Sequence, residues 1–180
     1  MNDGTAPDWR ALLESSVDTF NRYRASHPDA RVELAGANLQ GLMLAGADLH
    51  GANLYETDLA WIDLTAANLE GADLRRCRME GCTLTGARLD NALMEFANLR
   101  AATLSGASLR GVTLKGGTLQ GADLTNTSFH GSDLRRVSFC DSDLRGAVCT
   151  AANFSEADLR WAHFELDDLG DADLRAARIR

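Results

Sequence analysis

The stretch GADLTNTSFHGSDLRRVSFCDSDLRGAVCTAANFSEADLRWAHF, residues 121–164, places one large side chain at almost every fifth position. An α-helix repeats every 3.6 residues and a β-strand every two, so neither element alone explains a period of five. A short fixed period over many copies is typical of solenoids, in which each unit buries its apolar side chain only by stacking on the next unit. The large residues of this stretch are Leu124, Phe129, Leu134, Phe139, Leu144, Phe154, Leu159 and Phe164, and Cys149 occupies the remaining slot.

The five-residue frame continues without a slip from residue 32 to residue 180. Of its 30 central positions, Leu occupies 22, Phe four and Met two. Ala occupies 17 of the 30 positions that lie two residues before a centre, and Gly is frequent two residues after a centre. Alternate residues of an extended segment point the same way, and glycine permits a corner with positive φ. We therefore expect each unit to be a short extended piece that ends in a corner.

These units resemble the A(D/N)LXX motif of the pentapeptide repeat family, as in AGADL (45–49), HGANL (50–54), EGADL (70–74) and QGADL (120–124). The resemblance implies an all-β solenoid, a right-handed quadrilateral β-helix with about 20 residues per coil and about 7.5 coils. We expect two parts: a capping helix with its linker at 1–30, and the β-helix at 31–180.

Residues 1–30 do not repeat by five, and their apolar side chains recur at nearly helical spacing. The pattern predicts one helix from about Pro7 to Ala25, preceded by a capping box formed by Thr5 and Asp8. We expect this helix to cover the first coil, which would otherwise expose its leucines and its unpaired backbone. The apolar residues in question are Trp9, Leu12, Leu13, Val17 and Phe20.

The other end of the repeat shows no sequence pattern for a capping helix. An apolar end with free strand edges tends to bind a partner. We therefore expect two chains to stack through this end as a closed, two-fold homodimer. The residues expected at the dimer end are Phe164, Leu169, Leu174 and Ile179.

Composition and charge narrow the functional classes. The chain is 45% hydrophobic with a net charge of −8, which argues against disorder and against a generally basic nucleic-acid-binding protein. No apolar run approaches the roughly 18 residues of a membrane span, and MNDGTAPDWR (1–10) lacks the features of a secretory signal. We expect a cytoplasmic protein that binds neither membrane nor nucleic acid directly.

Catalytic patterns are missing from the sequence. The four cysteines form no C-x-x-C pair, and His50 and His130 fall four coils apart, too far to share a metal ion. No glycine-rich phosphate loop or nucleophile elbow occurs. We therefore expect no enzymatic activity, no cofactor and no metal, with small buried cysteines and one surface thiol.

An acidic cluster near the C-terminus is the sharpest charge feature. It holds seven acidic residues and one basic residue, Arg160. The cluster indicates either a solubility feature or a docking patch for a basic partner, with Trp161 and Leu166 as outward anchors. Asp167 falls in a slot that normally points inward, so either that coil is distorted or the carboxylate is hydrated. The seven acids are Glu156, Asp158, Glu165, Asp167, Asp168, Asp171 and Asp173.

Two partner classes and a structural role remain open. The family resemblance implies a DNA mimic that binds DNA gyrase or another type II topoisomerase and protects it from an antibiotic, as a resistance or self-immunity protein. The alternative is a regulatory or scaffolding adaptor that binds another protein, such as a transcription regulator, through Tyr55, Trp61 and Phe96. A purely structural role is the third. A continuous acidic stripe would favour mimicry, whereas mixed charge with aromatic patches would favour an adaptor.

Overall fold

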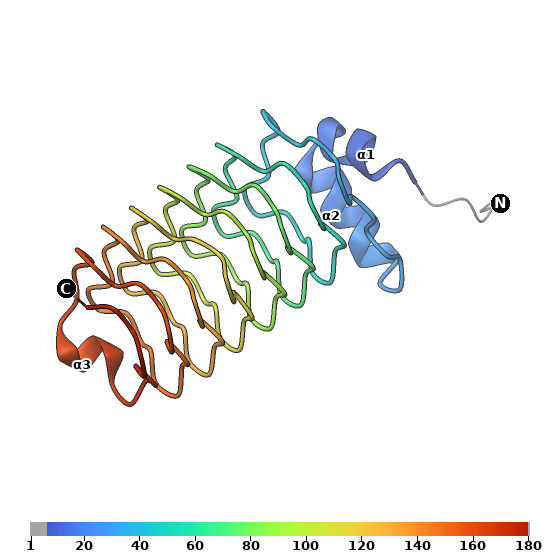
Figure 1. The fold of residues 1–180 in the computed structure, drawn as a ribbon. Coiled ribbons are helices and arrows are strands. Elements are labelled where there is room, and N and C mark those ends of the chain that lie inside the picture. Colours follow the sequence, from blue (N-terminus) through green and yellow to red (C-terminus); the bar gives the residue numbers. More distant parts are fainter. Residues whose placement is uncertain (1–6, 180) are drawn as a thin grey trace.

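The computed structural model describes residues 7–179, and Figure 1 shows a rod of stacked coils with helices at both ends. Isolated parallel bridges join residues that are 20 positions apart, from Glu33–Asn53 to Asp158–Arg178. A bridge recurs every five residues along the chain. Because the offset equals four pentapeptides, each coil has four sides, and every side lies against the same side of the next coil.

Backbone hydrogen bonds hold neighbouring coils together at each pentapeptide. The Leu34 amide donates to the Asn53 carbonyl at 2.8 Å, and the Asn53 amide donates to the Val32 carbonyl at 2.8 Å. At the corner, the Gly36 amide donates to the Tyr55 carbonyl at 2.8 Å. The same pattern recurs along the rod, so the backbone polar groups of one coil are satisfied by the next coil.

The interior of the rod is a continuous apolar column of central residues and their small neighbours. Phenylalanines fill it in the C-terminal half, where Phe139 lies 6.2 Å from Phe129 and 5.2 Å from Phe154 between ring centroids. Thr127 and Ala152, the small residues two positions before Phe129 and Phe154, are fully buried beside them. Larger rings therefore occupy the space that smaller neighbours leave, as close packing requires.

Three of the four cysteines belong to this interior. Cys77, Cys82 and Cys149 are buried, and burial raises the pKa of each thiol to about 12. Cys140 is half-buried on a corner. The expectation of small buried cysteines and one surface thiol is confirmed.

Every corner from Gly36 to Trp161 imposes a left-handed backbone on the second residue after a centre. The sequence predicted this conformation only where glycine occupies the slot. Fourteen other residues also adopt it, including Trp61, Phe96 and Ala101 with φ of 61°, 61° and 53°. A side chain costs roughly 1–2 kcal/mol in this region, so the pairing between coils, and not the local preference, sets the corner.

The N-terminal segment contains two helices, α1 (Trp9–Ser15) and α2 (Val17–Ser26), where the sequence predicted one helix. Two adjacent serines cause the break. The Ser15 hydroxyl donates to the Leu12 carbonyl at 2.7 Å, and the Ser16 hydroxyl accepts from the Thr19 amide at 3.1 Å as the N-cap of α2. Asp8 caps α1 by accepting from the Ala11 amide at 3.0 Å, and Thr5 lies outside the described residues.

Both helices lie across the first coil (Figure 1). The Asn21 side chain accepts from the Asp48 amide at 2.8 Å and donates to the Gly46 carbonyl at 2.9 Å, which satisfies the strand edge there. Arg24 is buried and donates to the carbonyls of Ala30 at 2.6 Å and His50 at 2.8 Å. The central leucines of the first coil, Leu34, Leu39, Leu44 and Leu49, are accordingly at most 4% exposed.

A third helix, α3 (Leu166–Leu169), interrupts the last complete coil, where the sequence predicted an unbroken frame. The bridge between Val148 and Asp168 is missing from the otherwise regular series within residues 33–178. The turn of helix exposes Asp167 while Leu169 stays buried. Of the two alternatives for Asp167, a distorted coil is correct, because an extended segment would have buried an unpaired carboxylate.

The strained corners make a testable prediction at Ala101. We expect Ala101→Gly to raise the free energy of unfolding by about 0.5–1 kcal/mol, because relief of the left-handed strain exceeds the entropy cost of glycine. Ala102, the next residue, is buried in an ordinary conformation, so Ala102→Gly should lower stability by about 1–2 kcal/mol. Denaturant unfolding of both variants tests this, and destabilisation by Ala101→Gly would contradict the strain argument.

Candidate functional site

The outer surface, rather than an enclosed cavity, carries the functional candidates. Among residues 7–179, no group of three His, Cys, Asp or Glu side chains is placed to hold a metal ion. Neither α1 nor α2 is long and apolar enough to cross a membrane, and the same holds for every other described helix. The candidate binding features are therefore the charges and aromatic side chains on the four sides and corners.

Five Asp-Leu-Arg units form what we call Asp–Arg clamps. The Asp before a central Leu and the Arg after it both point outward, so their side chains meet on the surface. In each clamp, the distance from Nε to Oδ1 is 2.7–2.9 Å and that from Nη2 to Oδ2 is 2.5–2.7 Å. The clamps are Asp73–Arg75, Asp133–Arg135, Asp143–Arg145, Asp158–Arg160 and Asp173–Arg175.

The clamps lower the pKa of all five aspartates. Hydrogen bonds from the arginine side chain are the largest cause, and they bring the pKa of Asp143 and Asp158 to about 2. A lowered pKa means that each clamp favours the folded state above about pH 4; for Asp143 and Asp158 this benefit disappears as the pH falls through about 2. At neutral pH each clamp holds a carboxylate whose charge is offset by an adjacent guanidinium.

Three of the seven acids in the cluster are paired with arginines in the folded chain. Asp158 and Asp173 belong to clamps, and Glu156 forms an ion pair with Arg136 of the preceding coil at 2.8 Å. A count along the segment 156–173 missed Arg136 and Arg175 because they lie outside it.

Backbone amides hold two more acids of the cluster. Asp168 accepts from the amides of Glu165 at 2.8 Å and Gly146 at 3.1 Å, and Asp171 accepts from the Ala151 amide at 2.7 Å. Only two cluster acids, Glu165 and Asp167, are both exposed and free of any ion pair or side-chain hydrogen bond among the described residues, apart from the local cap of α3. Of the seven acids predicted to bind a partner, the structure therefore leaves Glu165 and Asp167 as the two most accessible carboxylates.

The predicted anchors of this region do point outward. Trp161 is 74% exposed and Leu166 is 76% exposed, the latter because α3 turns it away from the core. Trp161 borders a shallow hollow of about 490 Å³, which we call the Trp161 hollow. Its lining consists of Asp141, Arg145, Trp161, Ala162, His163, Phe164 and Glu165.

The aromatic anchors in the N-terminal half form a second patch. The Arg75 guanidinium lies 5.6 Å from the Tyr55 ring centroid, and the Arg76 guanidinium lies 5.9 Å from the Phe96 ring centroid. Hollows of about 310 and 560 Å³ adjoin these pairs and share Arg76 and Phe96. We call Tyr55, Arg75, Arg76, Glu95 and Phe96 the aromatic–arginine patch.

Glycines on the next coil fix the exposed rings in place. Phe96 is 60% exposed, and its ring lies where a side chain at Gly116 would be, 2.8 Å from the ideal Cβ position. Trp61, on the adjacent corner, likewise lies over Gly81, in the space that a side chain there would occupy. Sequence reasoning missed these pairings, although the signal was present: Trp61 and Phe96 are each followed 20 residues later by glycine.

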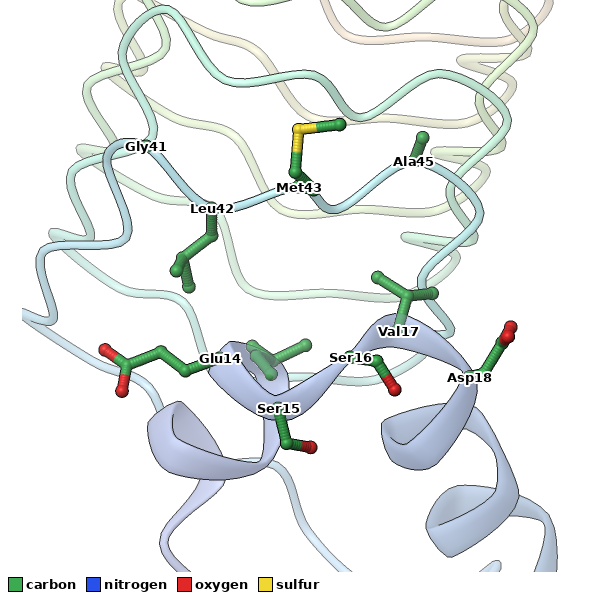
Figure 2. A pocket seen from close by; sticks show the side chains of 10 residues that line it. Glu14, Ser15, Ser16, Val17, Asp18, Gly41, Leu42, Met43 and Ala45 are labelled. Atoms are coloured by element: carbon green, nitrogen blue, oxygen red, sulfur yellow. The ribbon is translucent and has the colours of Figure 1, made fainter.

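A further hollow of about 520 Å³ lies between the helix pair and the first coil. Figure 2 shows Leu42 pointing toward the helices while Met43 points away from them. Met43 occupies a slot that is usually polar, yet the sequence analysis did not single it out. Glu14 and Asp18 lie at opposite ends of the hollow (Figure 2).

The predicted dimer end contains one buried and three accessible residues. Leu169, the last residue of α3, is buried, Phe164 and Leu174 are half-buried, and Ile179 is exposed. The N-terminal end, by contrast, is covered by α1 and α2. The C-terminal end thus remains the apolar end of the described chain.

Acidic residues form no continuous stripe along the rod. From Glu33 to Ile179, no column of outward side chains at 20-residue spacing holds more than two acids in succession. Glu70 and Asp90 make one such pair, and Asp123 and Asp143 make the other. The surface has mixed charge with aromatic patches.

Comparisons with known proteins agree with this architecture. The family model for pentapeptide repeats matches in eight copies, over residues 33–71, 62–95, 92–131 and 132–166. No curated protein matches the chain significantly.

Solved structures similar to this chain include three repeat proteins. A trypsin-treated form of QnrB1, a plasmid-mediated fluoroquinolone resistance protein, is 24% identical with a TM-score of 0.50, over 82% of this chain and 83% of that one. Rfr23 from the cyanobacterium Cyanothece 51142 is 18% identical with a TM-score of 0.47, over 82% and 99%. HetL from Nostoc sp. strain PCC 7120, involved in heterocyst differentiation regulation, is 28% identical with a TM-score of 0.29, over 89% and 90%. At these identities the likeness concerns the fold.

The Asp158–Arg160 clamp yields a titration prediction. We expect Arg160→Gln to raise the pKa of Asp158 from about 2 toward 3.8, because the main stabilising donor is lost. Arg178 also approaches Asp158, but at 3.9 Å, so Arg178→Gln should leave that pKa near 2. Carbon-13 NMR titration of the carboxyl group measures both variants, and equal shifts would show that the clamp is not the cause.

Proposed function

This chain belongs to the pentapeptide repeat family, and we propose that it is a non-enzymatic adaptor whose β-helix presents a fixed surface to a protein partner. The family resemblance further supports a right-handed helix of about 7.5 coils at 31–180, with residues 1–30 as its N-terminal cap. We assign its action to the cytoplasm, as predicted from the sequence.

The aromatic–arginine patch carries the adaptor proposal. The Phe96 ring is exposed yet held over Gly116, and the half-buried Tyr55 ring is held beside Arg75, so a partner can bury both rings at little cost in side-chain entropy. Aromatic and arginine side chains dominate the energetics of protein interfaces, and here they alternate along one corner. Trp61 on the next corner extends the same surface.

The second candidate is the DNA mimic that protects DNA gyrase or another type II topoisomerase from an antibiotic. The observations in its favour are the net charge of −8 and the exposed acids Glu165 and Asp167. The mixed columns and the Asp–Arg clamps favour the adaptor, because a mimic of the phosphate backbone needs closely spaced uncompensated charges.

Site-specific crosslinking tests the adaptor function. A photo-reactive phenylalanine analogue at Phe96 should label a discrete partner in cells of the source organism, and the double variant Tyr55→Ala/Trp61→Ala should reduce that labelling several-fold. The analogue at Val148, which is 48% exposed on another side of the coil, is the matched control. Equal labelling from positions 96 and 148 would contradict the proposed surface.

A supercoiling assay tests the second candidate separately. Purified DNA gyrase with a fluoroquinolone is assayed with the wild-type chain, with Glu165→Gln/Asp167→Asn and with Phe96→Ala. Relief of poisoning that is lost only in the first variant would establish topoisomerase protection. No effect across micromolar concentrations would exclude it.

We also propose that two chains join through the C-terminal end as a homodimer, because Phe164, Leu174 and Ile179 remain accessible there. We expect Ile179→Lys to produce monomers, since a desolvated ammonium at the joint is costly. Light scattering at micromolar concentration measures the mass, and Val148→Lys controls for the added charge. A monomeric wild-type chain would refute the dimer.

A further inference from the structure

The Trp161 hollow brings together an aromatic face and carboxylates from two neighbouring coils. Asp141 and Trp161 occupy the same corner slot, 20 residues apart, so their backbones lie about 5 Å from each other. Glu165 enters the hollow from the next corner, immediately before α3. The hollow therefore lies between two corners of the last complete coil, with Trp161 on one side and Glu165 on the other.

The charge of the hollow is negative. Among the described residues, neither Asp141 nor Glu165 forms an ion pair with a basic side chain. Arg145 also lines the hollow, but Asp143 holds its guanidinium through bonds of 2.9 and 2.5 Å. The clamp thus compensates the one arginine of the lining and leaves two carboxylates available to a cation.

We propose that the Trp161 hollow is a receptor for an arginine side chain of a partner protein. A planar guanidinium can stack on the indole of Trp161 while its N–H groups donate to the carboxylates of Asp141 and Glu165. Leu166, which follows Glu165 in the chain and is exposed, offers an apolar contact to the residue next to that arginine. Charge complementarity selects a basic partner segment over an acidic or neutral one.

Trp61 provides a natural control inside the same molecule. It occupies the same corner slot five coils away, with φ of 61° against 64° and an exposure of 72% against 74%. Its ring lies over Gly81, whereas Trp161 borders a hollow whose two carboxylates form no ion pair among the described residues, Glu165 accepting only the backbone amide that caps α3. Exposure of tryptophan alone therefore predicts equal cation binding at both rings, and the proposed receptor predicts binding at Trp161 only.

The test is a titration with a blocked pentapeptide, acetyl-Gly-Gly-Arg-Gly-Gly-amide, followed through the indole N–H signals of the full chain by NMR. Trp61→Phe and Trp161→Phe assign the signals. We expect the arginine peptide to shift the Trp161 signal saturably in the millimolar range and to leave Trp61 unchanged. The isosteric citrulline peptide, which lacks the charge, should bind at least about five-fold more weakly.

Variants of the acids separate the receptor from general electrostatics. Asp141→Asn/Glu165→Gln should weaken the arginine peptide at least about five-fold, while the matched variant Asp63→Asn, on the same side but three or more coils away, should not. Circular dichroism verifies the fold of each variant. Equal binding of the arginine and citrulline peptides, or an equal response at Trp61, would overturn the proposal.

This inference rests on the proposed role as a protein-binding rod but not on the aromatic–arginine patch. If Phe96 crosslinks to a partner but the arginine peptide does not bind at Trp161, the arginine-receptor proposal is wrong and the adaptor function still stands. If the arginine peptide binds at Trp161 but Phe96 crosslinks to no partner, the receptor stands and the aromatic–arginine patch as the adaptor surface is wrong.

Discussion

The pairing of each pentapeptide with the one 20 residues later is the constraint on which the rest of the structure depends. It satisfies the backbone between neighbouring coils, and it fixes a left-handed conformation at each corner from Gly36 to Trp161 whatever residue is there. It also makes the surface a regular grid, in which neighbours lie two residues apart along the chain or 20 residues apart between coils. Every ion pair and aromatic contact described for the outer surface joins such neighbours.

The grid explains why net charge is a poor guide to this surface. Asp and Arg on either side of a buried Leu meet within one pentapeptide, and pairs such as Arg136 and Glu156 meet between coils. Surface ion pairs of this kind add little stability. Their effect is on recognition: they compensate most carboxylates and leave a few, at defined positions, to act on a partner.

The period of five sufficed to predict the core, the positions of the corners and the buried cysteines, because the same pattern of large, small and polar residues recurs at thirty positions. Features that occur only once in the chain were harder to predict from the sequence. The break at Ser16 depends on one hydroxyl that caps α2, and helical periodicity does not register it. The only sign of α3 in the sequence was Asp167, a charged residue at a position of the repeat that normally points inward.

The candidate sites were predicted in part. Trp161, Leu166, Trp61 and Phe96 point outward as expected from the frame. Their surroundings did not follow from a linear reading, since the relevant neighbours are 20 residues away. Gly116 beneath Phe96 and Asp141 beside Trp161 become visible only when the sequence is written in rows of 20.

The two corner tryptophans show how such a rod acquires binding specificity. The fold fixes their backbone and exposure alike, so any difference between them must come from the adjacent coil. At Trp61 that neighbour is Gly81, which gives the ring a flat support and no charge. At Trp161 the charge comes from the preceding coil, where Asp141 occupies the slot that Gly41 occupies before Trp61, and from Glu165 at the start of α3. Substitution of single outward residues can therefore create distinct recognition sites on one rigid scaffold without disturbing the core, because the inward and outward residues alternate strictly.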